Sequence, residues 1–141
     1  NVIDIINDIK LYFDPKLHKN HSIMFINTKI DSYEIDGDRI LLMWAFENLI
    51  KNAVDSLAQQ NGKIIITTYK TKNNIVIDFQ DNGKGINRRN QKVIFKPGFS
   101  TKKRGWGLGL NLAKRIIEDI HHGQLTLTSS KKGKTIFRIK L

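Results

Sequence analysis

A glycine-rich stretch between residues 81 and 109 constrains this chain more than any other feature of its sequence. Six of the ten glycines fall there, with little hydrophobic periodicity. Such a stretch inside a compact domain is usually functional or disordered, and glycine lets backbone N–H groups approach an anion closely. Its last part, Gly105–Gly109, leads into a helix expected from about Leu110, whose free N–H groups and dipole favour phosphate. We therefore favour a phosphate-binding loop over a merely flexible one.

The glycine spacing excludes three well-known phosphate-binding loops. Dinucleotide-binding loops and protein-kinase loops need G-x-G-x-x-G, whereas residues 105–109 follow G-x-G-x-G. Gly133-Lys134-Thr135 imitates the end of a Walker A loop, but Thr128 stands where that loop needs its first glycine. A strand pattern also follows there instead of a helix. The phosphate site therefore belongs to another class.

Hydrophobic periodicity gives the order of the elements. We expect helices over about 2–12, 38–58 and 110–122, and strands over about 23–30, 63–69, 74–80, 124–128 and 135–141. Asp38 is the expected N-cap of the long helix, Pro15 bends or restarts the first one, and Gly123 is expected at the C′ position of the third. This order predicts an α+β class with a largely antiparallel sheet, in one domain over residues 1–141.

Composition narrows the class of protein further. The 141 residues, 40% hydrophobic and 26% charged, fit one globular domain that buries a core without metal or disulfide support. The absence of cysteine excludes disulfides, thiolate metal sites and thiol nucleophiles. No apolar run approaches about 18 residues, and the N-terminal residues resemble neither a signal peptide nor a membrane anchor. Since residue 1 is not Met, we expect a piece of a longer chain.

The chain is strongly basic. It has 24 Lys and Arg against 13 Asp and Glu, a formal net charge of +11. This charge suits nucleic acid, a phosphorylated ligand or an acidic partner protein. Genome-driven enrichment in Lys, Asn and Ile explains it equally well.

Three polar residues share one face of the long, mostly apolar helix. Asn48, Asn52 and Asp55 lie at i, i+4 and i+7. Burying an amide without a partner costs about 1–3 kcal/mol. Two amides on one stripe therefore indicate a helix that faces a polar ligand or a hydrated ion, although a solvated helix face explains either amide alone.

Four motifs, taken together and in this order, resemble a known family. Glu47–Asp55 resembles the N box of histidine-kinase ATP-binding domains, Asp81–Ile86 their G1 box, Ile94–Lys102 their F box and Gly105–Leu110 their G2 box. The match covers residues 38–141. The wider group includes the gyrase, Hsp90 and MutL ATPases. The resemblance implies a two-layer α/β sandwich (the Bergerat fold), with helices covering one face of a mixed, largely antiparallel sheet.

The resemblance assigns the adenine-binding roles. Asp81 corresponds to the carboxylate that accepts a hydrogen bond from the adenine amino group, which distinguishes adenine from guanine. An Asx turn before glycine is the alternative interpretation of Asp81 in isolation. Gly83 and Gly85 let the backbone turn close against the base. Thr135 corresponds to a strand threonine whose hydroxyl holds the adenine or a bridging water, and is otherwise an ordinary β-branched strand residue.

The N box carries the expected metal and catalytic positions. Asn52 corresponds to the Mg²⁺ ligand, and an amide oxygen suits this hard ion. Asn48 stands where hydrolysing members of the superfamily place a catalytic Glu, and an amide cannot act as a general base. This departure favours transfer of the γ-phosphate to a protein side chain over hydrolysis. Glu47 is the expected polariser of the incoming histidine, with a plain surface charge as the alternative.

The segment Lys96–Arg104 corresponds to the mobile lid over the triphosphate, with Phe95 and Phe99 anchoring its base. Trp106 is unusual in a G2 box, and a contact with the lid or with a partner stays open. The resemblance places the following residues in the nucleotide site: Asn48, Asn52, Asp55, Asp81, Gly83, Gly85, Ile86, Phe95, Ser100, Thr101, Lys102, Gly105, Gly107, Leu108, Gly109, Leu110 and Thr135.

The resemblance implies a protein-histidine kinase catalytic domain that binds ATP and Mg²⁺. Family members carry the phosphoacceptor histidine on a separate dimerisation hairpin, followed directly by Glu or Asp. None of the four histidines here has such a neighbour, so we expect the acceptor elsewhere in the parent kinase. We expect this domain to be cytoplasmic and monomeric in isolation, within a dimeric kinase whose other partner is a response regulator receiver domain.

Two other functions stay open. A hydrolytic ATPase of the same superfamily is disfavoured by Asn48 and by the short chain. A basic nucleic-acid-binding module would explain the charge, but Lys and Arg are scattered and most aromatic residues lie in apolar runs, so we expect no nucleic-acid partner.

Overall fold

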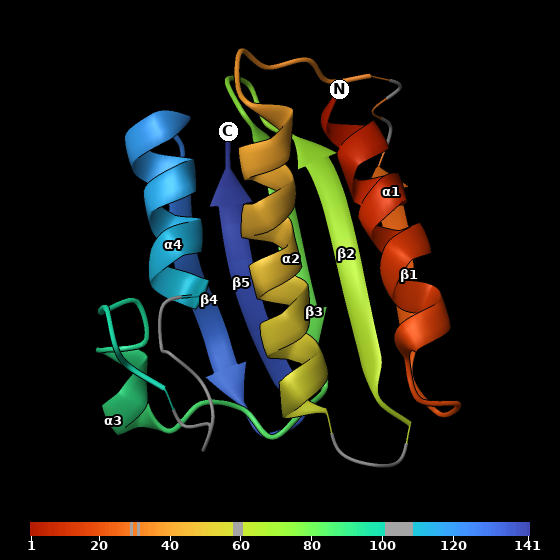
Figure 1. Cartoon of the computed structure of the whole chain (residues 1–141), viewed down its shortest axis with the longest axis vertical. Coiled ribbons are helices and arrows are strands. Elements are labelled where there is room, and N and C mark those ends of the chain that lie inside the picture. The colour runs from red at the N-terminus through yellow and green to blue at the C-terminus, as the bar shows by residue number, and fades with distance from the viewer. Residues whose placement is uncertain (29, 31, 58–60, 101–108) are drawn as a thin grey trace.

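The computed structural model describes residues 1–28, 30, 32–57, 61–100 and 109–141 (Figure 1). The helices are α1 (Val2–Phe13), α2 (Arg39–Ser56), α3 (Arg88–Gln91) and α4 (Gly109–Arg115), with a 3₁₀ turn, η1 (Asp14–Lys16), and a π-helical turn, η2 (Ile116–Ile120). The strands are β1 (Ser22–Thr28), β2 (Lys63–Lys70), β3 (Ile75–Asp81), β4 (Gln124–Lys131) and β5 (Lys134–Lys140). None of the helices in these described ranges has both the length and the apolar composition that a membrane span requires.

The five strands form one mixed sheet in the order β1-β2-β3-β5-β4. β1 runs parallel to β2, and every other neighbouring pair is antiparallel. Helices α1, α2 and α4 all cover the same face of this sheet (Figure 1). The predicted two-layer α+β architecture is confirmed.

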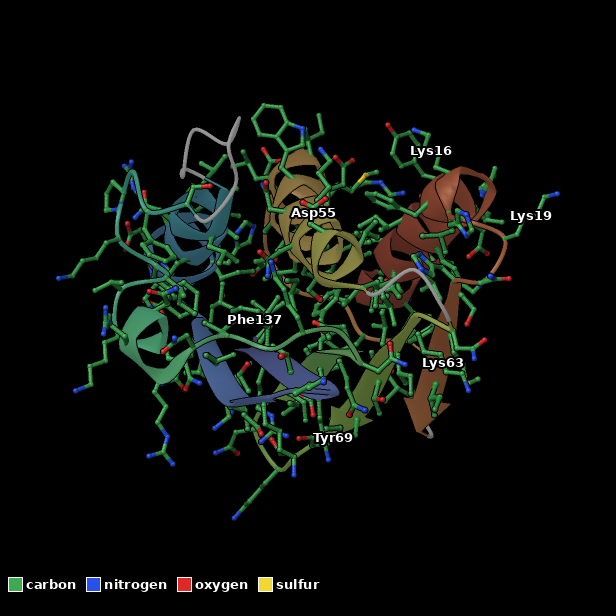
Figure 2. The ribbon with its side chains drawn as sticks, turned by 90° about the horizontal axis from the view of Figure 1, so that it is seen from below. Lys16, Lys19, Asp55, Lys63, Tyr69 and Phe137 are labelled. Carbon is green, nitrogen blue, oxygen red and sulfur yellow. The ribbon has the colours of Figure 1, made fainter. Side chains whose placement is uncertain are left out.

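The core lies between the helices and the sheet. Helix α2 turns its apolar residues, including Phe46 and Leu49, onto the strands, and the Phe46 and Phe79 rings lie 5.5 Å apart. Alternate residues of β2 and β5 are buried, as expected for strands with one covered face. Figure 2 shows Phe137 between the two layers and Tyr69 on the opposite face of the sheet.

Several predicted boundaries need correction. The first helix reaches Phe13 because that side chain is buried in the core, and the first strand ends at Thr28 before the predicted Ile30. Helix α3 lies in the stretch expected to lack regular structure, where Asn87 caps it by accepting from the Arg89 N–H at 3.0 Å. Its four residues carry no apolar periodicity that could have revealed it.

The end of the third predicted helix also differs from the expectation. After α4 the chain adopts the π-helical turn η2, and the residue in the left-handed conformation is His122, with φ of 54°. Gly123 therefore lies one position past C′. Gly123 is required for close packing instead, because a Cβ there would lie 2.4 Å from the Lys140 carbonyl oxygen.

Candidate functional site

A buried carboxylate ends strand β3 at one end of the sheet. Asp81 is only 2% exposed, and its Oδ1 accepts hydrogen bonds from Ser56 Oγ at 2.8 Å and from the Gly83 N–H at 2.9 Å. Burial raises the pKa of Asp81, and these two hydrogen bonds oppose the increase. Neither donor reaches Oδ2. One oxygen of this carboxylate is therefore fixed by the protein while the other can accept from a ligand.

The turn after Asp81 lies directly against the end of α2. The Lys84 N–H donates to the Ser56 carbonyl at 3.0 Å. A Cβ on Gly83 would lie 2.3 Å from both the carbonyl oxygen and the hydroxyl of Ser56, so position 83 has no room for a side chain. Glycine here is a requirement of packing against Ser56, and the predicted close approach of Gly83 to the adenine base stays a prediction.

The β4–β5 hairpin closes the other side of this turn. Thr135 is paired in register with Asp81 and is 2% exposed, and its hydroxyl lies 2.9 Å from Ser130 Oγ. The Ile86 N–H donates to Ser130 Oγ at 2.8 Å. Gly85 has φ of +78°, and a Cβ there would lie 2.7 Å from the carbonyl carbon of Lys131. The structure therefore brings together the predicted Asp81, Gly83, Gly85, Ile86 and Thr135.

The N-box residues follow one face of α2 toward the same end. Asn48 donates from Nδ2 to the Trp44 carbonyl at 2.8 Å, and a Cβ on Gly109 would lie 2.9 Å from Asn48 Oδ1. The predicted G2-box helix therefore begins against the N box. Asn52 is half-buried, and Asp55 is exposed near the end of α2 (Figure 2).

Glu47 lies beside this face. Its side chain is 25% exposed, and its Oε2 lies 3.6 Å from Lys51 Nζ one turn later. This long ion pair holds the carboxylate only loosely, because partly exposed pairs of this kind contribute little. The carboxylate is therefore accessible to an incoming group.

The two F-box aromatic residues, Phe95 and Phe99, pack against the core of the domain. The Phe95 ring meets Phe137 edge-on with centroids 6.0 Å apart, and Lys114 Nζ lies 4.7 Å from the Phe95 centroid. Phe99 and Leu110 pack partly buried against the core, and Ser100 is half-buried. The remaining predicted residues lie outside the described ranges: Thr101, Lys102, Gly105, Gly107 and Leu108, together with Trp106.

Two serines of the site were missed from the sequence. Ser56 orients Asp81, and Ser130 joins the Thr135 hydroxyl to the Ile86 backbone. Ser56 follows Asn48 and Asn52 at the same four-residue spacing, so the helix stripe could have revealed it. Ser130 carries no such signal, because its role depends on a strand pairing.

The oxygen atoms that these side chains present at the Asp81 end of the sheet suit a nucleotide with its divalent cation. A half-fixed carboxylate in a tight glycine turn matches a hydrogen-bond donor on a flat base, and the amides of α2 offer neutral oxygen ligands. Among the described residues, no group of three His, Cys, Asp or Glu side chains could hold a metal ion alone. On α2 the residue that could hold a Mg²⁺ ion is Asn52, because an amide oxygen suits an ion that keeps water and phosphate oxygens as its other ligands.

Comparison with known families agrees with this geometry. Residues 37–141 match the family described as histidine kinase-, DNA gyrase B-, and HSP90-like ATPase. The chain belongs to this family, as a catalytic ATP-binding domain of the sensor histidine kinase type.

Individual relatives give the same picture. The chain is 32% identical over 139 residues to sporulation kinase C of Bacillus subtilis, covering 98% of this chain and 32% of that kinase. It therefore spans about a third of that relative. The catalytic domain of histidine kinase ThkA superposes over the whole chain and 91% of its own, with a TM-score of 0.88 and 28% identity. ThkA has also been solved in complex with the response regulator protein TrrA, with a TM-score of 0.80 and 27% identity over 99% of this chain and 40% of that one.

Proposed function

We propose that this domain binds Mg-ATP and transfers the γ-phosphate to a histidine on a separate phosphoacceptor and dimerisation domain of a two-component sensor kinase. The observation that carries the proposal is the buried Asp81, with Oδ1 held by Ser56 and Gly83 and Oδ2 left for a ligand. A buried acceptor rejects a ligand that lacks the matching donor, because the unpaired group costs about 1–3 kcal/mol. The adenine amino group supplies that donor.

The N box supports the metal and phosphate part of the proposal. Asn52 offers its amide oxygen to Mg²⁺, and Asn48 lies beside Gly109 at the start of α4. Mg²⁺ supplies charge neutralisation on the phosphates when bound. The lid residues and the N-terminus of α4 complete the phosphate site in this proposal, with Asp55 at its margin.

The chemistry follows from the acceptor. A ring nitrogen of the incoming histidine forms a bond to the γ-phosphorus, and the bond from that phosphorus to the bridging oxygen breaks as ADP leaves. Glu47 accepts a hydrogen bond from the other ring nitrogen and makes the attacking nitrogen more nucleophilic. Since Asn48 cannot take a proton from water, hydrolysis is slow relative to transfer.

The partners follow from the same chemistry. A phosphohistidine is a donor for a receiver domain, and the related ThkA was solved with the response regulator protein TrrA. The domain acts on the cytoplasmic side, where ATP and Mg²⁺ are available. It is a monomer in isolation, and the parent kinase is a dimer.

Calorimetric titration with a non-hydrolysable ATP analogue tests the proposal, with and without Mg²⁺. Binding should strengthen with Mg²⁺. Asp81→Asn should weaken binding by at least about 100-fold, because the amide NH₂ of Asn would face the adenine amino group, which is also a hydrogen-bond donor. Asp78→Asn is the matched control, because it makes the same change on the same strand outside the proposed site. Asp78 Oδ1 accepts a hydrogen bond from Arg138 Nε at 2.7 Å. Equal loss in both variants, or no binding by the folded wild type, would refute the proposal.

A further inference from the structure

The positive charge of this chain is unevenly distributed along the sequence. Residues 1–81 carry nine Lys and Arg against eleven Asp and Glu, a net of −2. Residues 82–141 carry fifteen against two, a net of +13. The excess charge therefore belongs entirely to the part of the chain that follows strand β3.

The two carboxylates of the second part do not offset this charge near the site. Glu118 Oε1 lies 2.8 Å from Lys114 Nζ, and Asp119 Oδ2 lies 3.7 Å from Arg115 Nε. The Leu125 N–H donates to Glu118, and Leu125 is near the start of β4. These acids therefore lie at the end of the sheet opposite to Asp81.

Six of the described cations in residues 82–141 lie at the Asp81 end of the sheet. This basic rim consists of Lys84, Arg88, Arg89, Lys131, Lys132 and Lys134, all exposed and none in an ion pair with a described carboxylate. Helix α3 and the β4–β5 turn lie at the same end of the molecule as the last turn of α2 (Figure 1).

Hydrogen bonds attach the basic rim directly to the adenine end of the site. The Gly133 N–H donates to the Gly83 carbonyl at 2.8 Å, and Gln91 Nε2 donates to the Ile86 carbonyl at 2.8 Å. Lys134 immediately precedes Thr135, the strand partner of Asp81. The segments that carry the cations are thus held at the margin of the site, the β4–β5 turn by a backbone hydrogen bond and α3 by the Gln91 side chain.

We propose that the basic rim steers anionic nucleotides into the site and so sets their association rate. This inference rests on the proposed function. Clustered charge of one sign beside a site raises association rates by about 10- to 1,000-fold, and the field extends about 8 Å at physiological salt. The rim acts before the ligand is bound, so it raises the association rate more for a ligand of higher negative charge. The dissociation rate depends on contacts inside the site. An anionic nucleotide is favoured over nucleic acid because the rim borders the Asp81 turn directly.

Stopped-flow measurements with a fluorescent ATP analogue test this proposal. The rim variant combines Arg89→Gln, Lys131→Gln and Lys132→Gln. The control combines Lys70→Gln, Lys72→Gln and Lys140→Gln at the other end of the sheet, so both variants lose the same net charge. At low salt the rim variant should associate about 3- to 10-fold more slowly than the control, with dissociation unchanged and a shallower dependence on ionic strength.

The charge of the ligand provides a second test. The ratio of the two variants' association rates should shrink from ATP to ADP to AMP analogues and vanish for an adenosine analogue. Equal association rates for the two variants, or a difference confined to dissociation, would refute steering while leaving nucleotide binding intact. Duplex DNA that binds the wild type but not the rim variant, with nucleotide association unchanged, would assign the rim to nucleic acid. A wild type that binds no nucleotide at all would remove the proposed function itself.

Discussion

Burial of the Asp81 carboxylate costs the fold stability, while the proposed function gives the same side chain the role of recognising adenine. Its burial raises its pKa, so the folded state binds a proton on this group more tightly than the unfolded chain does. Asp81 therefore contributes most to stability when protonated, and that contribution is lost as pH rises from about 4 through the raised pKa. At neutral pH the fold carries a charged group in a poorly hydrated position.

Replacing Asp81 with Asn should therefore raise the thermal midpoint at pH 7, while nucleotide binding is lost. The amide oxygen can still accept from Ser56 and Gly83, so the local contacts persist. Each kcal/mol regained corresponds to about 2–4 °C in a chain of this size. The difference from wild type should narrow as pH falls toward 4, as thermal melts at several pH values will show. A midpoint that drops equally at every pH would mean that the carboxylate itself maintains the fold.

Ser56 positions Asp81 and should affect binding through it. Ser56→Ala removes a hydrogen bond to a charged group, which contributes about 1.5–3 kcal/mol, so ATP should bind about 10-fold more weakly. The variant should also raise the pKa of Asp81 further. The decline of ATP affinity in acid should then begin at higher pH than in the wild type, measured by calorimetry across pH. Ser22→Ala, an exposed serine on β1, is the control. A uniform loss at all pH values would indicate a merely structural effect.

At the scale of elements, the contact between α2 and the turn after β3 determines the geometry of the site. Gly83→Ala would place a Cβ 2.3 Å from the Ser56 carbonyl and separate the two elements. We expect a loss of about 1–3 kcal/mol in the free energy of unfolding and weaker ATP binding.

Gly133→Ala is the matched comparison for that prediction. Gly133 has φ of +87° with nothing within 4 Å of its Cβ position, so only backbone strain of about 1–2 kcal/mol is expected. ATP affinity should stay at the wild-type value. Urea unfolding and calorimetry of both variants check this, and unchanged ATP affinity in Gly83→Ala would contradict the packing argument.

A histidine joins the end of η2 to the start of α2. His121 Nε2 accepts from the Asp38 N–H at 3.0 Å, and Nδ1 lies 2.7 Å from the Ile116 carbonyl oxygen, to which it must donate. His121 should therefore carry its proton on Nδ1 when neutral, which nitrogen-15 NMR of the imidazole can determine. An Nε2-protonated ring would contradict this connection.

The sequence predicted the elements better than the contacts between them. The N-cap at Asp38 and the hairpin of β2 and β3 follow from local patterns and are confirmed. Ser130 could not be identified, because its role depends on the bulged pairing of β4 with β5. Nor could the π-helical turn, which shifts the left-handed residue from Gly123 to His122. Such features arise from tertiary packing that no local periodicity records.

At the scale of the whole molecule, α1 and β1 belong to the same core as the motif-bearing region. The family match begins at residue 37, yet α1 buries Val2, Ile5, Ile6, Ile9 and Phe13, and β1 pairs with β2 along seven residues. ThkA superposes over the entire chain, including these elements. We propose that residues 1–141 form one cooperative unit.

A chain of residues 37–141 should therefore fail to fold stably. Losing α1 removes five buried side chains worth about 1.5–3 kcal/mol each, which rivals the whole stability of a typical domain. Urea unfolding should show one transition for residues 1–141 and no cooperative transition for the shortened chain. A shortened chain with native-like stability would show that α1 and β1 are not needed for the rest of the domain to fold.

Trp44 gives this domain an intrinsic optical reporter. Trp44 is 51% exposed on α2, and its backbone carbonyl accepts a hydrogen bond from the Asn48 side chain. Asn48 in turn lies one helical turn before Asn52. Tryptophan emission responds to changes in polarity around the ring, and the chain contains one other tryptophan, Trp106. With Trp106 replaced by Phe, the emission of Trp44 alone follows events at the N box. If the proposed function holds, the arrival of a phosphoacceptor at this helix can then be timed without attaching a dye to either protein.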